Sequence, residues 1–168
     1  MSETFSDYQN KSGLNCVISC GGKCCQNPEV EASIFEMLPM AQKILEEGKL
    51  DEWVQKLETA EQDFCLIYDQ QSGKCTRYEE RPSLCRMFGV AGYKNKRNEV
   101  TLSICKFIKE SYGVSEVQIT PNEPVPMLKD WSFKLGSVDH RLIQDKMPIN
   151  QALYQALMKV ALYAQLQE

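Results

Sequence analysis

Eight cysteines are the residues of this chain whose type and spacing could do chemistry. Four of them fall within ten residues and include an adjacent pair, and the other four follow one at a time. Thiolates bind zinc tetrahedrally in groups of four, and iron–sulfur clusters use the same ligands. Eight thiols therefore match two four-thiolate sites, and a polynuclear site with bridging thiolates would also use them. The candidate metal ligands are Cys16, Cys20, Cys24, Cys25, Cys65, Cys75, Cys85 and Cys105.

The adjacent pair Cys24-Cys25 limits how the metals can be arranged. Neighbouring Cα atoms lie ~3.8 Å apart, and in an extended backbone their side chains point to opposite sides. Both thiols could bind one ion only if the backbone were contorted. The simpler arrangement, which we predict, is that Cys24 and Cys25 serve two neighbouring centres or that one of them bridges two metals. Ligand softness and geometry allow zinc and iron–sulfur about equally, so both remain open.

Two other roles for cysteine compete with metal binding. A cysteine can be an ordinary buried apolar residue, and this alternative applies to Cys65 or Cys105 taken alone. Disulfides are the second alternative, but the N-terminal residues lack the basic start and apolar run of a signal peptide. We therefore expect a cytoplasmic protein, where thiols stay reduced and clustered cysteines favour metal or redox chemistry.

Composition excludes several other classes of protein. The 168 residues are 43% apolar and 25% charged, with a formal charge of −4, and they suggest one domain over residues 1–168. The acidic balance argues against a nucleic-acid binder, and no stretch approaches the ~20 apolar residues that cross a membrane. His140 is the only histidine, so we expect it to be solvated or to cap a helix, and Cys–His catalysis is poorly supported. Whether the protein is an enzyme is left open.

Basic residues near the cysteines could offset the negative charge of thiolate centres. Arg81 and Arg86 are the stronger candidates, because Pro82 keeps Arg81 extended and lets the next residues turn N–H groups toward a sulfur. The full set is Lys23, Arg77, Arg81, Arg86 and Lys106. We expect Tyr68 and Tyr78 to pack rather than to donate their hydroxyl groups.

Helices are expected to position the cysteines. Ser33 and Glu36 form a capping box, after which apolar residues recur at helical spacing as far as Gly48. Pro39 should kink this helix or split it in two. A second helix is expected at about 50–60, with Trp53, Val54 and Leu57 on its inner face, and an amphipathic helix from about residue 150 to the end. That last helix is marked by Ile149, Leu153, Leu157, Val160, Ala161 and Ala164.

Between these helices the sequence predicts short and irregular elements. Residues 64–68 read as a strand, 69–73 as a turn and 75–78 as a returning strand. A turn or short helix is expected at 81–86 and a basic loop at 94–98. Residues 100–105 are expected to form a strand or an extended approach to the last cysteine, and 113–136 an extended connector, after a polar tail at 1–13. The predicted fold is mainly α, a small single domain. Helices at 33–61 and 150–167 wrap an irregular, short β-hairpin metal core within 14–109, and 110–168 form the connector and C-terminal helix.

Two separated motifs resemble the bacterial YkgJ-type cysteine-cluster family, also called CxxCxxCC, which is described as zinc- or iron-chelating. The first motif is Cys16 to Cys25, and the second runs from Cys65 through Cys75-Thr76-Arg77-Tyr78-Glu79-Glu80-Arg81-Pro82-Ser83-Leu84-Cys85-Arg86, with Cys105 matching a further downstream cysteine. The resemblance covers about residues 14–106. Three residues separate Cys20 from Cys24 where the family name implies two.

The resemblance implies metal chelation but no particular reaction. Together with the residues, it predicts a thiolate protein that binds zinc or iron at two neighbouring centres. One alternative is an iron–sulfur protein with a redox or catalytic role. A second alternative is an interaction module whose metal only stabilises the fold, and an exposed apolar stripe on the last helix would favour it. The expected partners are metal ions, and no protein partner is indicated.

Overall fold

The computed structural model describes residues 7–8, 11, 20–88, 91–112 and 125–167. The chain is mainly helical and divides into two compact units. The long-helix unit consists of Gly21–Pro82 and Asp139–Glu168, and the β4–β5 unit consists of Met1–Cys20 and Ser83–Val138. The single domain expected over residues 1–168 stays a prediction. Cys16, most of the expected tail and the first half of the expected connector lie outside the described residues.

The first helix of the long-helix unit is α2 (Ile34–Glu46), and it begins with the predicted capping box. The Glu36 N–H donates to Ser33 Oγ at 3.3 Å, and the Ser33 N–H donates to Glu36 Oε2 at 3.0 Å. Gly48 follows the helix with φ +67°, which confirms it as the stop. Pro39 lies inside α2, yet the helix continues through it as one element, so it is not split.

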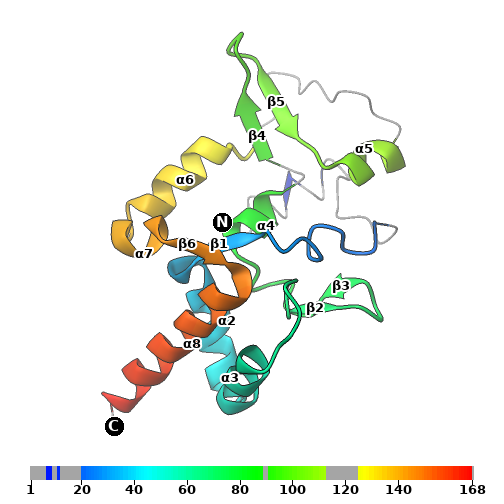
Figure 1. The fold of residues 1–168 in the computed structure, drawn as a ribbon. Helices are drawn as coiled ribbons and strands as arrows, with labels where there is room; N and C mark the ends of the chain where they lie inside the picture. Colours follow the sequence, from blue (N-terminus) through cyan, green and yellow to red (C-terminus); the bar gives the residue numbers. More distant parts are fainter. Residues whose placement is uncertain (1–6, 9–10, 12–19, 89–90, 113–124, 168) are drawn as a thin grey trace. The chain divides into compact units, whose positions relative to one another are not determined.

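Three helices build the core of this unit. α2 packs against α8 (Ile149–Gln165), and α3 (Leu50–Glu58) also contacts α8 (Figure 1). Trp53 is the buried residue of α3, while Val54 and Leu57 are half-buried. The largest fully buried apolar side chains are Met37, Met40, Ile44, Ile67, Leu153 and Leu157. The predicted last helix is confirmed, because its apolar spacing places one face on α2.

A short strand pair joins the starts of the two long helices. β1 (Glu31–Ser33) pairs antiparallel with β6 (Lys146–Pro148), and the Ile149 N–H donates to the Val30 carbonyl at 3.0 Å. α7 (His140–Gln144) precedes β6, and His140 is exposed on it, which agrees with a solvated histidine. The pair holds the first turn of α8 beside the segment that follows Cys25.

The predicted hairpin exists but is shorter than expected. β2 (Tyr68–Asp69) pairs with β3 (Lys74–Cys75), and the turn between them ends at Gly73 with φ +68°. The strand predicted over 64–68 is wrong except at Tyr68, since 64 is a bend, 65 has no regular structure and 66–67 form a turn. The physical reason is that backbone groups of this segment bond to side chains of α8 and α3 instead of to a strand.

The β4–β5 unit is built on a second hairpin. α4 (Ser83–Met87) precedes β4 (Ala91–Lys94), which pairs with β5 (Val100–Ser103), and α5 (Lys106–Tyr112) follows. The short helix after Arg81 and the strand at 100–103 are therefore confirmed, while β4 and α5 were not predicted. Its core consists of Tyr8, Met87, Ala91, Leu102 and Ile108.

The second half of the expected connector is helical rather than extended. α6 (Leu128–Gly136) begins directly after Met127. The prolines at 121, 124 and 126 suggested an extended path for the whole stretch, but Leu128 and Trp131 recur at helical spacing and pack on the core of the unit. Gly92 leaves room for the preceding segment, because a Cβ there would meet Met127 Sδ and Val125 Cγ1 at 2.9 Å.

No helix among the described residues is both long and apolar enough to span a membrane.

Candidate metal centre

The long-helix unit contains four of the eight cysteines, and its turns bring them into one region. Cys24 and Cys25 lie in a tight turn, where the Cys25 N–H donates to the Gly22 carbonyl at 2.8 Å. Gly21 and Gly22 have φ of +57° and +68°, a left-handed backbone that glycine adopts without strain. The two neighbouring thiols lie close enough here to shift each other's pKa. The geometry thus differs from the extended one assumed above, in which adjacent side chains diverge.

Tyr68 fastens this turn to the hairpin. Its hydroxyl donates to the Gly21 carbonyl at 2.5 Å, and Gln26 Nε2 donates to the same oxygen at 2.7 Å and to Tyr68 Oη at 2.9 Å. A Cβ on Gly22 would clash with the Tyr68 ring. The expectation that Tyr68 only packs is therefore wrong, since the buried ring also uses its polar end.

Cys65 is linked directly to the first turn. Its N–H donates to the Cys25 carbonyl at 3.1 Å, and its own carbonyl accepts from the Tyr68 N–H at 3.1 Å. Cys75 lies opposite Tyr68 in the hairpin register. Backbone hydrogen bonds and strand pairing therefore connect all three cysteine-bearing segments of this unit.

The thiols influence one another's ionisation. The hydrogen bond from the Cys25 thiol lowers the pKa of Cys24 to about 6, and Arg81 contributes in the same direction. The same bond raises the pKa of Cys25 far above its ordinary value, as do burial and the neighbouring Cys65 and Cys75. Burial is the main cause that raises the pKa of Cys65 to about 11 and that raises the pKa of Cys75. One thiolate is thus favoured at the turn, and its neighbours remain protonated in the metal-free protein.

Arg81 is the cation that lies beside these thiols. It lowers the pKa of Cys24 and of Cys75, while its guanidinium carbon sits 3.4 Å from the centroid of the Tyr78 ring and its Nε donates to the Tyr78 carbonyl at 3.0 Å. Tyr78 is 41% exposed, so it stacks against Arg81 rather than packing in the core. Arg77 instead forms a two-pronged pair with Glu47, at 2.7 and 2.5 Å.

The donor chemistry fits zinc or iron, because four sulfur ligands in one region are what these metals use. Among the described residues, however, no three cysteine, histidine or acidic side chains are already gathered as a metal-binding group. Binding a metal would therefore require the four thiols to draw together and to lose protons, which a bound cation favours.

The other cysteines belong to the β4–β5 unit. Cys20 is 7% exposed, and Cys85 is half-buried on α4. Cys105 is half-buried and packs on the core formed around Tyr8, Leu102 and Ile108. Lys106, next to Cys105, pairs with Glu110 at 3.7 Å on the surface. Cys16 lies outside the described residues, so the structure gives no position for one of the eight predicted ligands.

Sequence reasoning missed three polar residues that support the cysteine segments. Asn150 bonds to the backbone on both sides of Cys65, Lys56 Nζ donates to the Leu66 carbonyl at 3.2 Å, and Gln26 bonds to Gly21. Asn150 directly follows the first residue of α8 and resembles an ordinary helix start. Nothing local in the sequence distinguishes it from a capping residue, because its partners are more than eighty positions away.

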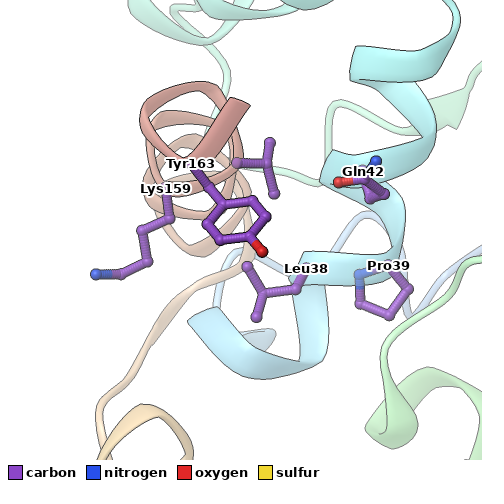
Figure 2. Close-up of a pocket in the computed structure, with 6 residues that line it drawn as sticks. Leu38, Pro39, Gln42, Lys159 and Tyr163 are labelled. Carbon is purple, nitrogen blue, oxygen red and sulfur yellow. The ribbon is translucent and has the colours of Figure 1, made fainter. Parts of the chain in front are cut away.

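A groove of about 470 Å³ lies between α2 and α8, on the same unit (Figure 2). Leu38, Pro39 and Gln42 line it from α2, and Lys159, Val160 and Tyr163 line it from α8. α8 also exposes an apolar row. That row consists of Met158, Leu162, Tyr163 and Leu166.

Comparison with known proteins places these cysteines in a family. No curated protein and no solved structure matches the chain. One family model does match residues 15–106, and its description reads "CxxCxxCC: Putative zinc- or iron-chelating domain". The matched range includes all eight cysteines. Because it spans more than half of the 168 residues, the protein belongs to the CxxCxxCC family of zinc- or iron-chelating domains.

Proposed function

We propose that the protein binds zinc or iron through thiolates and that Cys24, Cys25, Cys65 and Cys75 form one centre in the long-helix unit. The observation that carries the proposal is the convergence of three cysteine-bearing segments on Cys25. The charges of Cys24, Cys65 and Cys75 all bear on its pKa, and its carbonyl accepts from Cys65. Cys16, Cys20, Cys85 and Cys105 are the ligands proposed for the second centre. That the two centres are neighbours stays a prediction.

Several residues of this chain each have a distinct role in the proposed centre. Gly21 and Gly22 let the backbone turn so that both thiols of the pair face one region, and Tyr68 holds this turn against the hairpin. Arg81 offsets part of the negative charge that four thiolates carry. The bound metal would supply a closed four-sulfur cross-link between segments distant in sequence, and this role is structural.

The direct test is the metal content of protein purified without oxygen, with its visible spectrum. We expect about two metal ions per chain in the wild type and about one in Cys75→Ser, because each centre needs four ligands. The control is Gln70→Ala, an exposed substitution in the same hairpin that should leave both metals bound. Full metal content in both Cys75→Ser and Cys25→Ser would show that these thiols are not ligands.

The spectrum separates the two metal chemistries. A colourless protein with zinc would support a closed structural site, whereas a brown protein with iron and sulfide would support the iron–sulfur alternative with a redox or catalytic role. Cys24 is relevant to this choice because its side chain is exposed. It is also the one of the four proposed ligands in this unit whose pKa is lowered. A sulfur at the surface could lie at the mouth of a reactive centre.

The exposed row on α8 is the feature that would favour an interaction module. Met158 and Leu162 are 45% and 58% exposed. Monomeric proteins also expose apolar patches of a few hundred Å², so the row does not displace metal binding as the leading function. Light scattering tests whether the row takes part in association. Association through this row would be supported if the wild type had a mass above the 19.2 kDa of one chain and Leu162→Glu had a lower mass than the wild type.

A further inference from the structure

We propose that Asn150 is a positioning residue for Cys65 and that it fixes this thiol before any metal binds. Its side-chain amide bonds to the peptide groups on both sides of that cysteine. The Leu66 N–H donates to Asn150 Oδ1 at 2.9 Å, and Asn150 Nδ2 donates to the Phe64 carbonyl at 2.8 Å. Because the peptide groups on both sides of Cys65 are held, its backbone dihedral angles are restricted. The direction of its Cα–Cβ bond is therefore set.

The remaining backbone groups around Cys65 are also bonded. Its N–H donates to the Cys25 carbonyl and its carbonyl accepts from Tyr68, both at 3.1 Å. Lys56 donates to the Leu66 carbonyl at 3.2 Å. Among the side chains that bond to the backbone near Cys65, that of Asn150 connects the segment to a long helix, because Asn150 lies in the first turn of α8. It therefore transmits the rigidity of the α2–α8 core to a segment that has no strand partner.

The start of α8 is itself tied to the segment after the Cys24–Cys25 turn. The Ile149 N–H donates to the Val30 carbonyl at 3.0 Å, and β6 pairs with β1 just before it. Asn150 thus lies where the segment that follows Cys25 and the segment that contains Cys65 come together. A side chain there sets the register between the two cysteine segments.

Only asparagine fits both bonds at this length. Aspartate keeps the acceptor for the Leu66 N–H but places a carboxylate against the Phe64 carbonyl, and alanine removes both partners. Gln151 is the matched control, since it is exposed on the same turn of α8.

The test measures alkylation of Cys65 in the metal-free protein by mass spectrometry, with Cys75 as the internal reference. In wild type, Cys65 is 6% exposed and should react slowly. In Asn150→Ala its labelling relative to Cys75 should rise about 10-fold, because two lost hydrogen bonds ease local opening. Gln151→Ala should match wild type. Unchanged relative labelling in Asn150→Ala with a retained helical circular dichroism spectrum would overturn the proposal.

Hydrogen exchange keeps the proposal testable if Asn150→Ala does not fold. In metal-free wild type, the Leu66 amide should exchange as slowly as the core amides of α8, since one side chain joins them. If the Leu66 amide exchanged fast while the core amides of α8 exchanged slowly, the proposed role of Asn150 would be overturned. Asn150→Asp, which keeps this one bond, should protect Leu66 partly.

A final measurement rests on the proposed function and uses Zn²⁺ alone as the probe. Competition with a chromophoric chelator should show about 10- to 100-fold weaker zinc binding in Asn150→Ala than in Gln151→Ala, as for other residues that orient ligands. Equal affinities would count against Asn150. A wild-type protein that bound neither zinc nor iron would overturn the proposed function, while the labelling and exchange results would still judge Asn150.

Discussion

The Cys24–Cys25 turn places two neighbouring thiols with opposite tendencies to ionise. The hydrogen bond between them lowers the pKa of Cys24 to about 6 and raises the pKa of Cys25. Arg81 acts on Cys24 from the same unit and lowers its pKa further. At neutral pH the turn therefore offers one exposed thiolate, which is the chemical form that binds metals and reacts with electrophiles.

Alkylation of the metal-free protein tests this at the residue scale. Cys24 should be the first thiol modified at pH 7, and its rate should rise with pH to a midpoint of about 6. Arg81→Gln should move that midpoint upward, because the cation no longer stabilises the thiolate. Cys65 provides the contrast, since burial holds its pKa at about 11. A Cys24 midpoint near 9, its ordinary value, would contradict the assignment.

At the scale of elements, the hairpin is anchored to the end of α2 by an ion pair. Arg77 follows Cys75, is 12% exposed at its side chain, and bonds Glu47 with two nitrogens. Its guanidinium carbon also lies 5.9 Å from the ring centroid of Trp53 on α3. The hairpin is thus held by charge and by a buried aromatic ring, in addition to its short strand pair.

The pH dependence of stability should reveal this anchor. Arg77 holds the pKa of Glu47 at about 2, below its ordinary 4.5. Because the folded-state value is the lower one, the stabilisation is present above about pH 4.5 and is lost as the pH falls toward 2. Glu47→Gln should lower the melting temperature by a few degrees at pH 7 and show less acid sensitivity. Glu52→Gln, an exposed control, should melt like wild type throughout that range.

α8 has one face in the core and one at the surface, so two leucines on it should behave differently. Leu157 is fully buried against α2, and truncation to alanine should cost about 2–5 kcal/mol of unfolding free energy. Leu162 is 58% exposed, and the same change should cost less than about 0.5 kcal/mol. Urea unfolding of the two variants measures the difference. Equal costs would mean that the outer row is also covered in solution.

At the scale of the whole molecule, the proposed centres fall one in each compact unit. The long-helix unit holds Cys24, Cys25, Cys65 and Cys75, and the β4–β5 unit holds Cys20, Cys85 and Cys105 among the described residues. A metal that binds only the folded state stabilises it by mass action. Each unit should therefore depend on its own metal.

Removal of metal tests this dependence. Chelation should lower the melting temperature by about 5–10 °C, the shift expected when a ligand at a hundred times its dissociation constant is lost. Cys24→Ser and Cys85→Ser should each lose metal and stability together, because binding energy is folding energy in such sites. Either variant with full metal content and an unchanged melting temperature would remove that cysteine from the ligand set.

The sequence by itself determined the chemistry of the protein and its long helices. Cysteine type and spacing indicated thiolate metal binding and the family, because both follow from residue identities and their spacing along the chain rather than from contacts in space. The capping box at Ser33, the stop at Gly48 and the apolar period of α8 were readable because helix signals are local.

The tertiary structure decided how the cysteines are presented. The curved turn at Gly21 and Gly22 replaced the extended backbone expected around Cys24 and Cys25, and the Tyr68 hydroxyl that holds this turn is forty-seven positions away. The Asn150 amide substitutes for a strand partner of Phe64–Leu66 from a still greater separation. Such bonds depend on which distant segments the core brings together, and one sequence contains no local signal for them.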